Sequence, residues 1–510
     1  MFDTTPILVG AAQYVDRNRP TLDKSLSPAD IAAGVADAAL NNCAAHGNIA
    51  ATIDVLAVAR LFEHSVKDRT MWPNPFGCSN NMPASVGRRL GIKPGRLVYS
   101  EVGGETPQRL VNQMAEAISR NEVRSALITG AEALATIKNA RRAGITFDWR
   151  EEINEDFEDL WPDLPMVSDY ENRHGINIPI QVYALFEQAK RYELGSSVQS
   201  YRDSIGQLFS TFTEVAANNP FAQFPKIRTA EEIATVSSDN FLLAEPYAKW
   251  MVAQDAVNQG AAIVMTSVGI ARELAIPEIN WVYLTAYADA DELTVSERPR
   301  LATSAAQGEA LKYVLEVASL SPEEIDLIDL YSCFPIAVTS ACEHLGIASQ
   351  TSIQLTLTGG LPFFGGPGNN YSLHAIAEVI RRLRGRKSGD ALVVANGGYL
   401  SKHSIGSYSR VAPASWSPSD FHLSSTKADK VPLIESPNGR GRIESYSAIY
   451  HKSEPSRGFI IGRMLGSEER FLAISKPRDR KTLAVLFGEH PIGAEVVVSN
   501  DDGSNTFTVT

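Results

Sequence analysis

One motif occurs twice in this chain and constrains its fold more than any other feature. Residues 96–134, "RLVYSEVGGETPQRLVNQMAEAISRNEVRSALITGAEAL", indicate a strand, a Gly-Gly turn, a helix and a second strand. Residues 354–400, which contain "LTLTGGLPFFGGPGNNYSLHAIAEVIRRLRG" and "ALVVANGGYL", have the same order. Both helices show an apolar face with the 3.6-residue period, and both final strands are continuous apolar runs typical of buried parallel strands. The repeat predicts two similar α/β halves.

The segments around the repeat extend this plan to the rest of the chain. "PILVGAAQY" predicts a buried first strand, and residues 260–276 predict a strand and a helix that close the first half. "SPEEIDLIDLYSCF" starts with a helix N-cap at Ser321 and continues as a strand. After a Ser/Pro-rich stretch at 411–429, period-2 alternation predicts a small all-β domain. We therefore expect a first half at 1–275 with a polar helical insertion at about 135–244, a second half at 276–412 and a β domain at 413–510.

The composition limits the classes of function. The net charge of −12 over 510 residues argues against a nucleic-acid partner, because such proteins present a basic field. No apolar run reaches the roughly 18 residues of a membrane span, and the N-terminus shows no basic leader before an apolar core. Four scattered cysteines without a CxxC pair favour a reduced, cytoplasmic setting and argue against structural zinc. We expect no bound metal and no signal peptide.

The two halves, the insertion after the first Gly-Ala-Glu strand and the glycine loops resemble the thiolase superfamily. The similarity covers roughly residues 4–412 and is best to the sterol-carrier-protein type and to thiolase-like, acetyl-CoA acetyltransferase-like relatives. It rests on "VGGETPQ" with "LITGAEA", "NQGAAIVMTS", "DLYSCFP", "GGPGNNYSLHAIAEVIRRLR" and "NGGYLSKHS". The β section resembles the additional C-terminal domain of some thiolase-like proteins. The resemblance implies a five-layer α-β-α-β-α arrangement with an OB-like C-terminal domain.

The resemblance also implies a set of catalytic groups, and this chain lacks them. A thiolase acylates a cysteine at a helix N-terminus, activates it with the histidine of a Gly-His-Pro loop, and moves a proton with a second cysteine. In this sequence Gly103 stands nearest the nucleophile position, with Thr106 as a hydroxyl alternative after a shift. Gly366 replaces the histidine, and Asn396 replaces the second cysteine. The covalent mechanism is removed, because nucleophile and base act as one unit.

Other side chains are candidates to replace the lost groups. Cys333 lies at the C-terminal end of a strand, where ligands bind in α/β sheets, although the alternative is a small packing residue. His374 and His403 follow the two altered loops, and each is a candidate base or a structural histidine. Asn396 is a candidate donor to a thioester oxygen or a turn residue.

Substrate binding is expected from three places in the chain. Tyr331 replaces the histidine of the family's His-Asp-Cys-Phe pattern, in which Cys333 and Phe334 match. The run "KNARR" opens the insertion, which holds coenzyme A in the family, so its cations are candidates for phosphate contacts or an exposed helix face. The candidate binding residues are Tyr331, Gly397, Gly398, Lys138, Arg141, Arg142 and His174.

The sequence is compatible with three functions. The first is an acyl-CoA-handling acyltransferase of lipid metabolism with a non-standard active site. The second is a binding protein that keeps an acyl-CoA or lipid pocket without catalysis. The third is a subunit that acts with a partner thiolase, with the β domain as docking surface. We expect a coenzyme A thioester as substrate or ligand rather than a tightly bound cofactor, and a homodimer by analogy with ordinary thiolases.

Overall fold

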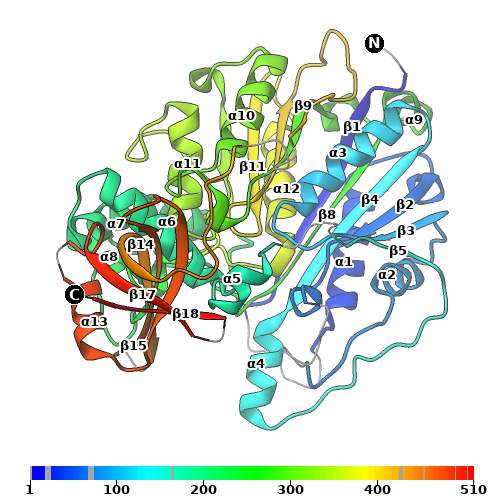
Figure 1. Cartoon of the computed structure of the whole chain (residues 1–510). Helices are drawn as coiled ribbons and strands as arrows, with labels where there is room; N and C mark the ends of the chain where they lie inside the picture. Colours follow the sequence, from blue (N-terminus) through cyan, green and yellow to red (C-terminus); the bar gives the residue numbers. More distant parts are fainter. Residues whose placement is uncertain are drawn as a thin grey trace.

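Two α/β halves and a small barrel make up the chain in a computed structural model (Figure 1). The structure describes residues 3–17, 25–66, 74–161, 166–423, 429–451, 454–488, 490–501 and 503–509. Residues 162–165 of the predicted insertion and 424–428 of the predicted boundary lie outside the described residues.

The first half is a mixed sheet with the order β3-β2-β4-β8-β1. Its strands β2, β3 and β4 are parallel, whereas β8 is antiparallel to both β4 and β1. Every residue of β4 and β8 is buried, which explains their apolar runs at residues 126–128 and 261–265. The strands are β1 (Pro6–Val15), β2 (Ile53–Val58), β3 (Arg96–Tyr99), β4 (Ser125–Ala133) and β8 (Asn258–Ser267), with the short β5 (Glu158–Asp159) beside β3.

The second half repeats this topology with the order β10-β11-β12-β9. Here β10 and β11 are parallel, and β12 is antiparallel to both β11 and β9, as β8 is to β4 and β1. Strand β9 pairs with β1 and joins the halves into one 11-stranded sheet. The predicted duplication is therefore confirmed. The strands are β9 (Val282–Asp291), β10 (Leu327–Leu330), β11 (Asp390–Gly397) and β12 (Lys402–Ser409), with β13 (His422–Leu423) beside β9.

One predicted strand is absent from the described residues, namely the apolar segment before Gly359-Gly360. The buried carboxylate of Asp329 accepts the Leu357 N–H at 2.7 Å and the Thr356 hydroxyl at 3.1 Å. A single backbone bond, from Leu330 N–H to the Leu355 oxygen, links the segment to β10. The prediction of a strand was wrong because side-chain bonds replace the ladder here.

The helices complete five layers, as the resemblance implies. Helices α3 (Thr106–Ser119) and α12 (Tyr371–Leu383) contact each other and strands of both halves, so they form the central layer. Almost every residue of α12 is buried, because a helix in a central layer has neighbours on all sides. The outer helices are α1 (Pro28–Asn42), α2 (Met82–Leu90) and α9 (Val268–Glu273) on the first half, and α10 (Ala305–Ala318) and α11 (Pro335–Leu345) on the second.

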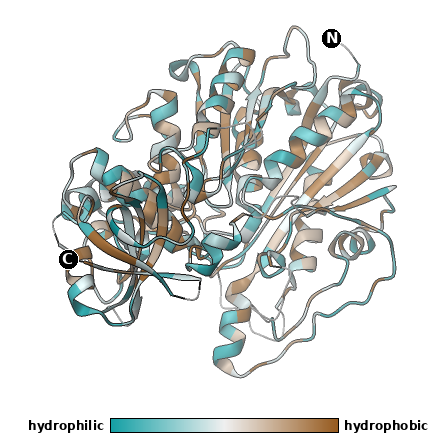
Figure 2. Cartoon of the chain, viewed as in Figure 1, coloured by the Kyte–Doolittle hydropathy of each residue, from teal (hydrophilic) through white to brown (hydrophobic). Residues whose placement is uncertain are grey.

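The insertion between β4 and β8 is mainly helical. It contains α4 (Leu134–Ala143), α5 (Asp169–Arg173), α6 (Pro179–Glu193), α7 (Val198–Asn218), α8 (Ala230–Ala234) and the strands β6 (Leu242–Ala244) and β7 (Tyr247–Ala248). Helix α4 projects from the body, whereas α6, α7 and α8 lie beside the barrel (Figure 1). Apolar residues concentrate on the strands of the interior (Figure 2). None of the described helices is both long and apolar enough to cross a membrane.

The C-terminal section is a closed barrel with the order β14-β15-β16-β18-β17, as expected for an OB-like domain. It is fixed to the rest of the chain by buried polar contacts. The fully buried guanidinium of Arg470 donates to the backbone oxygens of Ser296 at 2.9 Å and Arg298 at 2.5 Å. The elements are β14 (Gly439–His451), β15 (Glu454–Met464), β16 (Arg470–Ser475), α13 (Arg480–Leu486), β17 (Glu495–Asp501) and β18 (Ser504–Val509).

Candidate functional site

The glycine loops predicted from the repeat meet at the start of α3. The Gly103 N–H donates to Asn369 Oδ1 at 3.1 Å, and the Ser372 hydroxyl donates to the Gly104 oxygen at 2.7 Å. A Cβ on Gly104 would overlap the Tyr331 hydroxyl and would lie 2.7 Å from the Asn396 oxygen. The turn after β3, the residues after β10, the end of β11 and the loop before α12 therefore meet in one small space, although β3 lies far from β10 and β11 in the strand order.

Glu105 fills this space, although the sequence patterns do not mark it as a candidate site residue. It is the N-cap residue of α3, yet its carboxylate does not cap the helix. The side chain turns instead towards the glycine loops, where a Cβ on Gly103 or on Gly397 would overlap its carboxyl group. Both positions therefore need glycine as long as Glu105 keeps this orientation.

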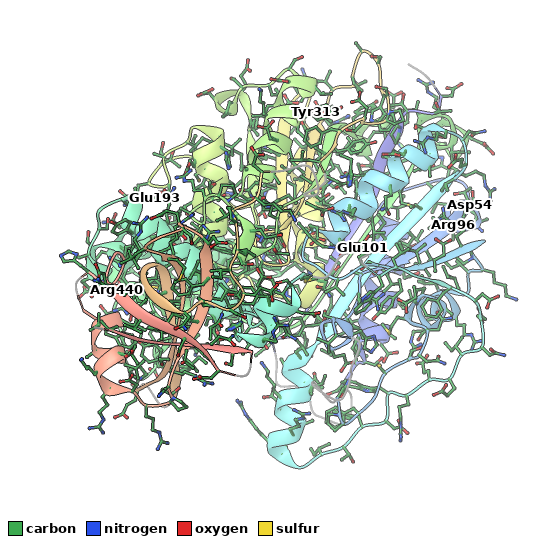
Figure 3. All side chains as sticks on the ribbon, viewed as in Figure 1. Asp54, Arg96, Glu101, Glu193, Tyr313 and Arg440 are labelled. Carbon is green, nitrogen blue, oxygen red and sulfur yellow. The ribbon has the colours of Figure 1, made fainter. Side chains whose placement is uncertain are left out.

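The carboxyl of Glu105 is fully buried, and neither of its oxygens has a hydrogen-bond partner among the described residues. Burial raises its pKa to about 7, although the cations of Lys402 and Arg109 act in the opposite direction. These cations face other acids, since Lys402 Nζ donates to Glu101 at 3.3 Å and Arg109 lies 3.3 Å from Asp291. Glu101 lies near the centre of the molecule in Figure 3. Glu105 is thus poised to gain or lose a proton near neutral pH.

Tyr183 of the insertion forms a second wall of the site. Asn396 Nδ2 donates to the Tyr183 oxygen at 2.9 Å, and the Leu400 N–H donates to the same oxygen at 3.0 Å. The Phe334 ring stacks on Tyr183 with ring centroids 4.2 Å apart. The amide oxygen of Asn396 has no hydrogen-bond partner among the described residues. Asn396 therefore belongs to the site with its oxygen unpaired and its nitrogen anchored.

Cys333 is placed close to this wall, with its sulfur 3.7 Å from Asn396 Nδ2. Burial raises the pKa of its thiol to about 12, so the thiol is protonated at neutral pH. A protonated thiol is a poor nucleophile. Thr106 is no substitute either, because its hydroxyl donates to the Gly103 oxygen at 2.9 Å and so closes the loop. The described site therefore has no activated nucleophile in the places that the sequence suggested.

The two candidate bases are fully buried. His403 is the partner of Asn396 in the β11–β12 register, and its Nε2 lies 2.9 Å from the Ser304 hydroxyl. Burial lowers the pKa of His403 to about 4. His374 lies 2.9 Å from Gln13 Oε1 on β1, and burial lowers its pKa to about 3. His374 therefore contacts β1 through Nδ1, and its ring packs on Phe364 of the glycine loop with ring centroids 5.0 Å apart.

The remaining predicted residues lie in three places. His174 joins the insertion to the barrel, since its Nδ1 lies 2.8 Å from the Tyr170 oxygen and its Nε2 accepts the Asn505 N–H at 2.9 Å. Both ring nitrogens of His174 are therefore engaged in contacts within the protein. Lys138, Arg141 and Arg142 lie on α4, where Lys138 pairs with Asp255 at 2.6 Å. Tyr331, Gly397 and Gly398 lie in the loops around Glu105. Gly366 lies in the other glycine cluster, where its N–H donates to the backbone oxygen of Gln254 at 2.8 Å.

The comparisons with known proteins support the fold and the family. Residues 424–503 match the family model of the thiolase-like protein type 1 additional C-terminal domain. An acetyl-CoA acetyltransferase from Methanothermobacter thermautotrophicus is 26% identical over 248 residues, which span 45% of this chain and 61% of that relative. The Acat5 thiolase from Ascaris suum, solved in complex with coenzyme A, is 16% identical with a TM-score of 0.56, and the match covers 80% of this chain and 100% of that one.

A closer likeness is to a monomeric SCP2-thiolase-like protein type 1 from Mycobacterium smegmatis. Its crystal structure matches with a TM-score of 0.84 and 35% sequence identity, and the match covers 100% of both chains. The barrel is included in this match, so the likeness extends beyond the two halves. The chain therefore belongs to the SCP2-thiolase-like proteins of type 1.

Proposed function

We propose that this protein acts on acyl-CoA thioesters by proton transfer at Glu105, without a covalent acyl-enzyme. The observation that carries the proposal is the Glu105 carboxyl, which is buried, lacks a hydrogen-bond partner among the described residues and has a pKa of about 7. It lies at the junction of Gly103 and Gly397, close to the positions that correspond to thiolase thiols. A base near its operating pH is the group that proton abstraction requires.

The chemistry that fits this site is removal of a proton next to a thioester carbonyl. The ionised Glu105 carboxylate takes the proton from the carbon, and the electron pair of the broken C–H bond forms an enolate. The Tyr331 hydroxyl faces Gly104 in the same space and is the donor available to the enolate oxygen. The protonated Glu105 then returns its proton to that carbon, which restores the thioester. Neither Cys333 nor a histidine is needed in this sequence of steps.

Coenzyme A is proposed to lie towards α4, as the resemblance implies. Arg141 and Arg142 are exposed in the last turn of this helix, and guanidinium groups bind phosphates through paired hydrogen bonds. The solved Ascaris suum thiolase complex contains coenzyme A, which supports a thioester ligand for the same fold.

The test is hydrogen–deuterium exchange at the α-carbon of acetyl-CoA, acetoacetyl-CoA and a long-chain acyl-CoA in D2O, followed by mass spectrometry. The wild-type protein should accelerate exchange, and Glu105→Gln should reduce it at least about 100-fold, because a general base contributes that much or more. Glu187→Gln is the matched control. Glu187 is also fully buried with a pKa of about 7, but it accepts the Tyr201 and Tyr247 hydroxyls. Exchange that persists in Glu105→Gln would refute the assignment.

A second candidate, a non-catalytic acyl-CoA-binding protein, is favoured by the closed state of the site. The Glu105 carboxyl occupies the space at the glycine loops, so a thioester has to displace it. Calorimetry with coenzyme A and acyl-CoAs distinguishes the candidates. Binding without any α-proton exchange supports the second candidate, and exchange supports the first. A homodimer and a partner thiolase stay predictions, which light scattering and co-purification test.

A further inference from the structure

We propose that Glu63, His64 and Cys78 form a binding site for a zinc-class transition metal ion. The donor atoms of the three side chains lie within 4.8 Å of one another. His64 Nε2 lies 2.9 Å from the Cys78 sulfur and 4.0 Å from Glu63 Oε1. Glu63 and His64 belong to the short helix η3 (Phe62–His64) after β2, whereas Cys78 precedes α2. The site is independent of the function proposed for Glu105.

The imidazole of His64 is held in the orientation that a metal ligand needs. Its Nδ1 lies 2.7 Å from the Tyr99 hydroxyl, and that oxygen also accepts the Leu61 N–H at 3.0 Å. Both His64 and Tyr99 are buried, so the ring has little freedom. When Nδ1 carries the proton and donates to Tyr99, the lone pair of Nε2 points to the side of Cys78. A second hydrogen bond of this kind is the usual companion of a histidine ligand.

The carboxylate of Glu63 is also positioned from outside the cluster. Asn74 Nδ2 donates to Glu63 Oε1 at 3.1 Å and to the Gly77 oxygen at 3.0 Å, so it links Glu63 to the turn before Cys78. Around a tetrahedral zinc ion, with bonds of about 2.0 to 2.3 Å, two donor atoms are about 3.5 Å apart. The distances of 2.9 and 4.0 Å lie on either side of that value, so small side-chain rotations suffice.

The donor set favours zinc over the hard cations. One sulfur, one imidazole nitrogen and one carboxylate suit Zn²⁺ or Co²⁺, whereas Mg²⁺ and Ca²⁺ prefer oxygen alone. Zinc takes four ligands, and these side chains supply three of them. Metal binding would release the Cys78 thiol proton to solvent, because the thiolate is the ligand. The absence of a CxxC pair, which argued against structural zinc, does not apply to ligands that come from separate segments.

The alternative for the same residues is a reactive Cys78–His64 pair without metal. A nucleophile and a base at 2.9 Å, with the base oriented by Tyr99, satisfy the geometry of such a pair. The additional carboxylate favours a cation, because Glu63 would raise the negative charge beside a thiolate rather than assist its attack. The two possibilities differ in what protects Cys78 from alkylation.

The experiment uses the full chain, stripped with chelator and titrated with Co²⁺ as a spectroscopic probe for zinc. We expect one equivalent to bind with a thiolate-to-cobalt charge-transfer absorption, and Zn²⁺ to remove that absorption. Cys78→Ser and His64→Gln should each lose the absorption, whereas Cys342→Ala, a change at a buried thiol elsewhere, should keep it. Zinc should also slow the alkylation of wild-type Cys78 by iodoacetamide at least tenfold. A wild-type chain without the absorption, or rapid alkylation that zinc does not change, overturns the proposal.

Discussion

Glu105→Gln is expected to stabilise the protein at neutral pH and above, and to do so by an amount that depends on pH. In the folded chain the pKa of Glu105 is raised from 4.5 to about 7, mainly because burial disfavours the charged form. Between these two values the folded state keeps a proton that the unfolded state has lost, so stability falls as the pH rises and the loss is complete above about pH 7. At about 1.4 kcal/mol for each tenfold change in the proton equilibrium, the loss is about 3 kcal/mol.

Glutamine keeps the shape of the side chain without its titration, so the variant avoids this loss. For a chain of this length, about 3 kcal/mol corresponds to a rise in Tm of roughly 3 °C. The assay is thermal unfolding of both proteins from pH 4.5 to pH 8.5. The difference in Tm should be near zero at the lowest pH, grow through pH 6 and level off above pH 7. Since His374 and His403 are common to both proteins, their own titrations cancel in the difference.

A Tm difference that does not change with pH would refute the reasoning, because it would mean that Glu105 has an ordinary pKa. Glu187→Gln supplies the comparison. The two carboxyls share a pKa of about 7, but Glu187 accepts the Tyr201 hydroxyl at 2.5 Å, the Tyr247 hydroxyl at 2.6 Å and the Ile336 N–H at 3.0 Å. Its replacement disturbs these bonds, so at pH 4.5, where neither carboxyl is charged, Glu187→Gln should be less stable than wild type by about 1 to 3 kcal/mol.

Three further predictions concern other parts of the chain. Gly103→Cys should lower the Tm by roughly 3 °C or more, because φ at Gly103 is 144° and the new Cβ overlaps Glu105. Adding Glu105→Ala to that variant should restore part of the lost Tm. Arg470→Ala should destabilise the docked barrel by about 3 kcal/mol or more and speed its release by limited proteolysis, because two buried backbone oxygens lose their donor and the Glu444 carboxylate loses its ion pair. Cys333, with a pKa of about 12, should react with iodoacetamide at pH 8 on the order of a thousandfold more slowly than a free cysteine, as peptide mass spectrometry would show.

The fold was predictable from the sequence because apolar runs, glycine turns and helical periodicity all indicate the same order of strands and helices in both halves. Residues 126–128 of β4 and 391–395 of β11 are continuous apolar runs, which is what strands with buried faces on both sides require. The start of α3 at Thr106 follows from the Gly-Gly turn before it. The barrel follows from period-2 alternation and from closely spaced turns. The three domain ranges themselves stay a prediction, although the sheet order shows two equivalent halves.

The site was predictable only in part, because side-chain direction is not encoded in spacing. The loops of Gly103 and Asn396 could be identified from the sequence. Glu105 could not, because an acidic residue at the start of a helix is common and does not by itself indicate a site. An acid next to a glycine pair, in a loop that resembles a catalytic loop, is the signal that was available. The contact between His64 and Cys78 depends on the path of the loop between β2 and α2. The 13 residues between them show no pattern from which that path could be predicted. The strand predicted before Gly359 failed for a similar reason, since Asp329 binds that segment through its side chain.

The glycines at positions 103 and 397 and the carboxyl of Glu105 form one arrangement, in which each position depends on the others. Glycine at 103 and at 397 is required by the position of the carboxyl, since a Cβ at either would overlap it. A thiol at residue 103 is therefore incompatible with Glu105 as it lies. The same carboxyl lowers the stability of the folded chain at neutral pH by about 3 kcal/mol, and a glutamine would avoid this. A destabilising ionisable group that dictates its neighbours is typical of a functional site rather than of a packed core, which is why we place the chemistry at Glu105 and not at Cys333.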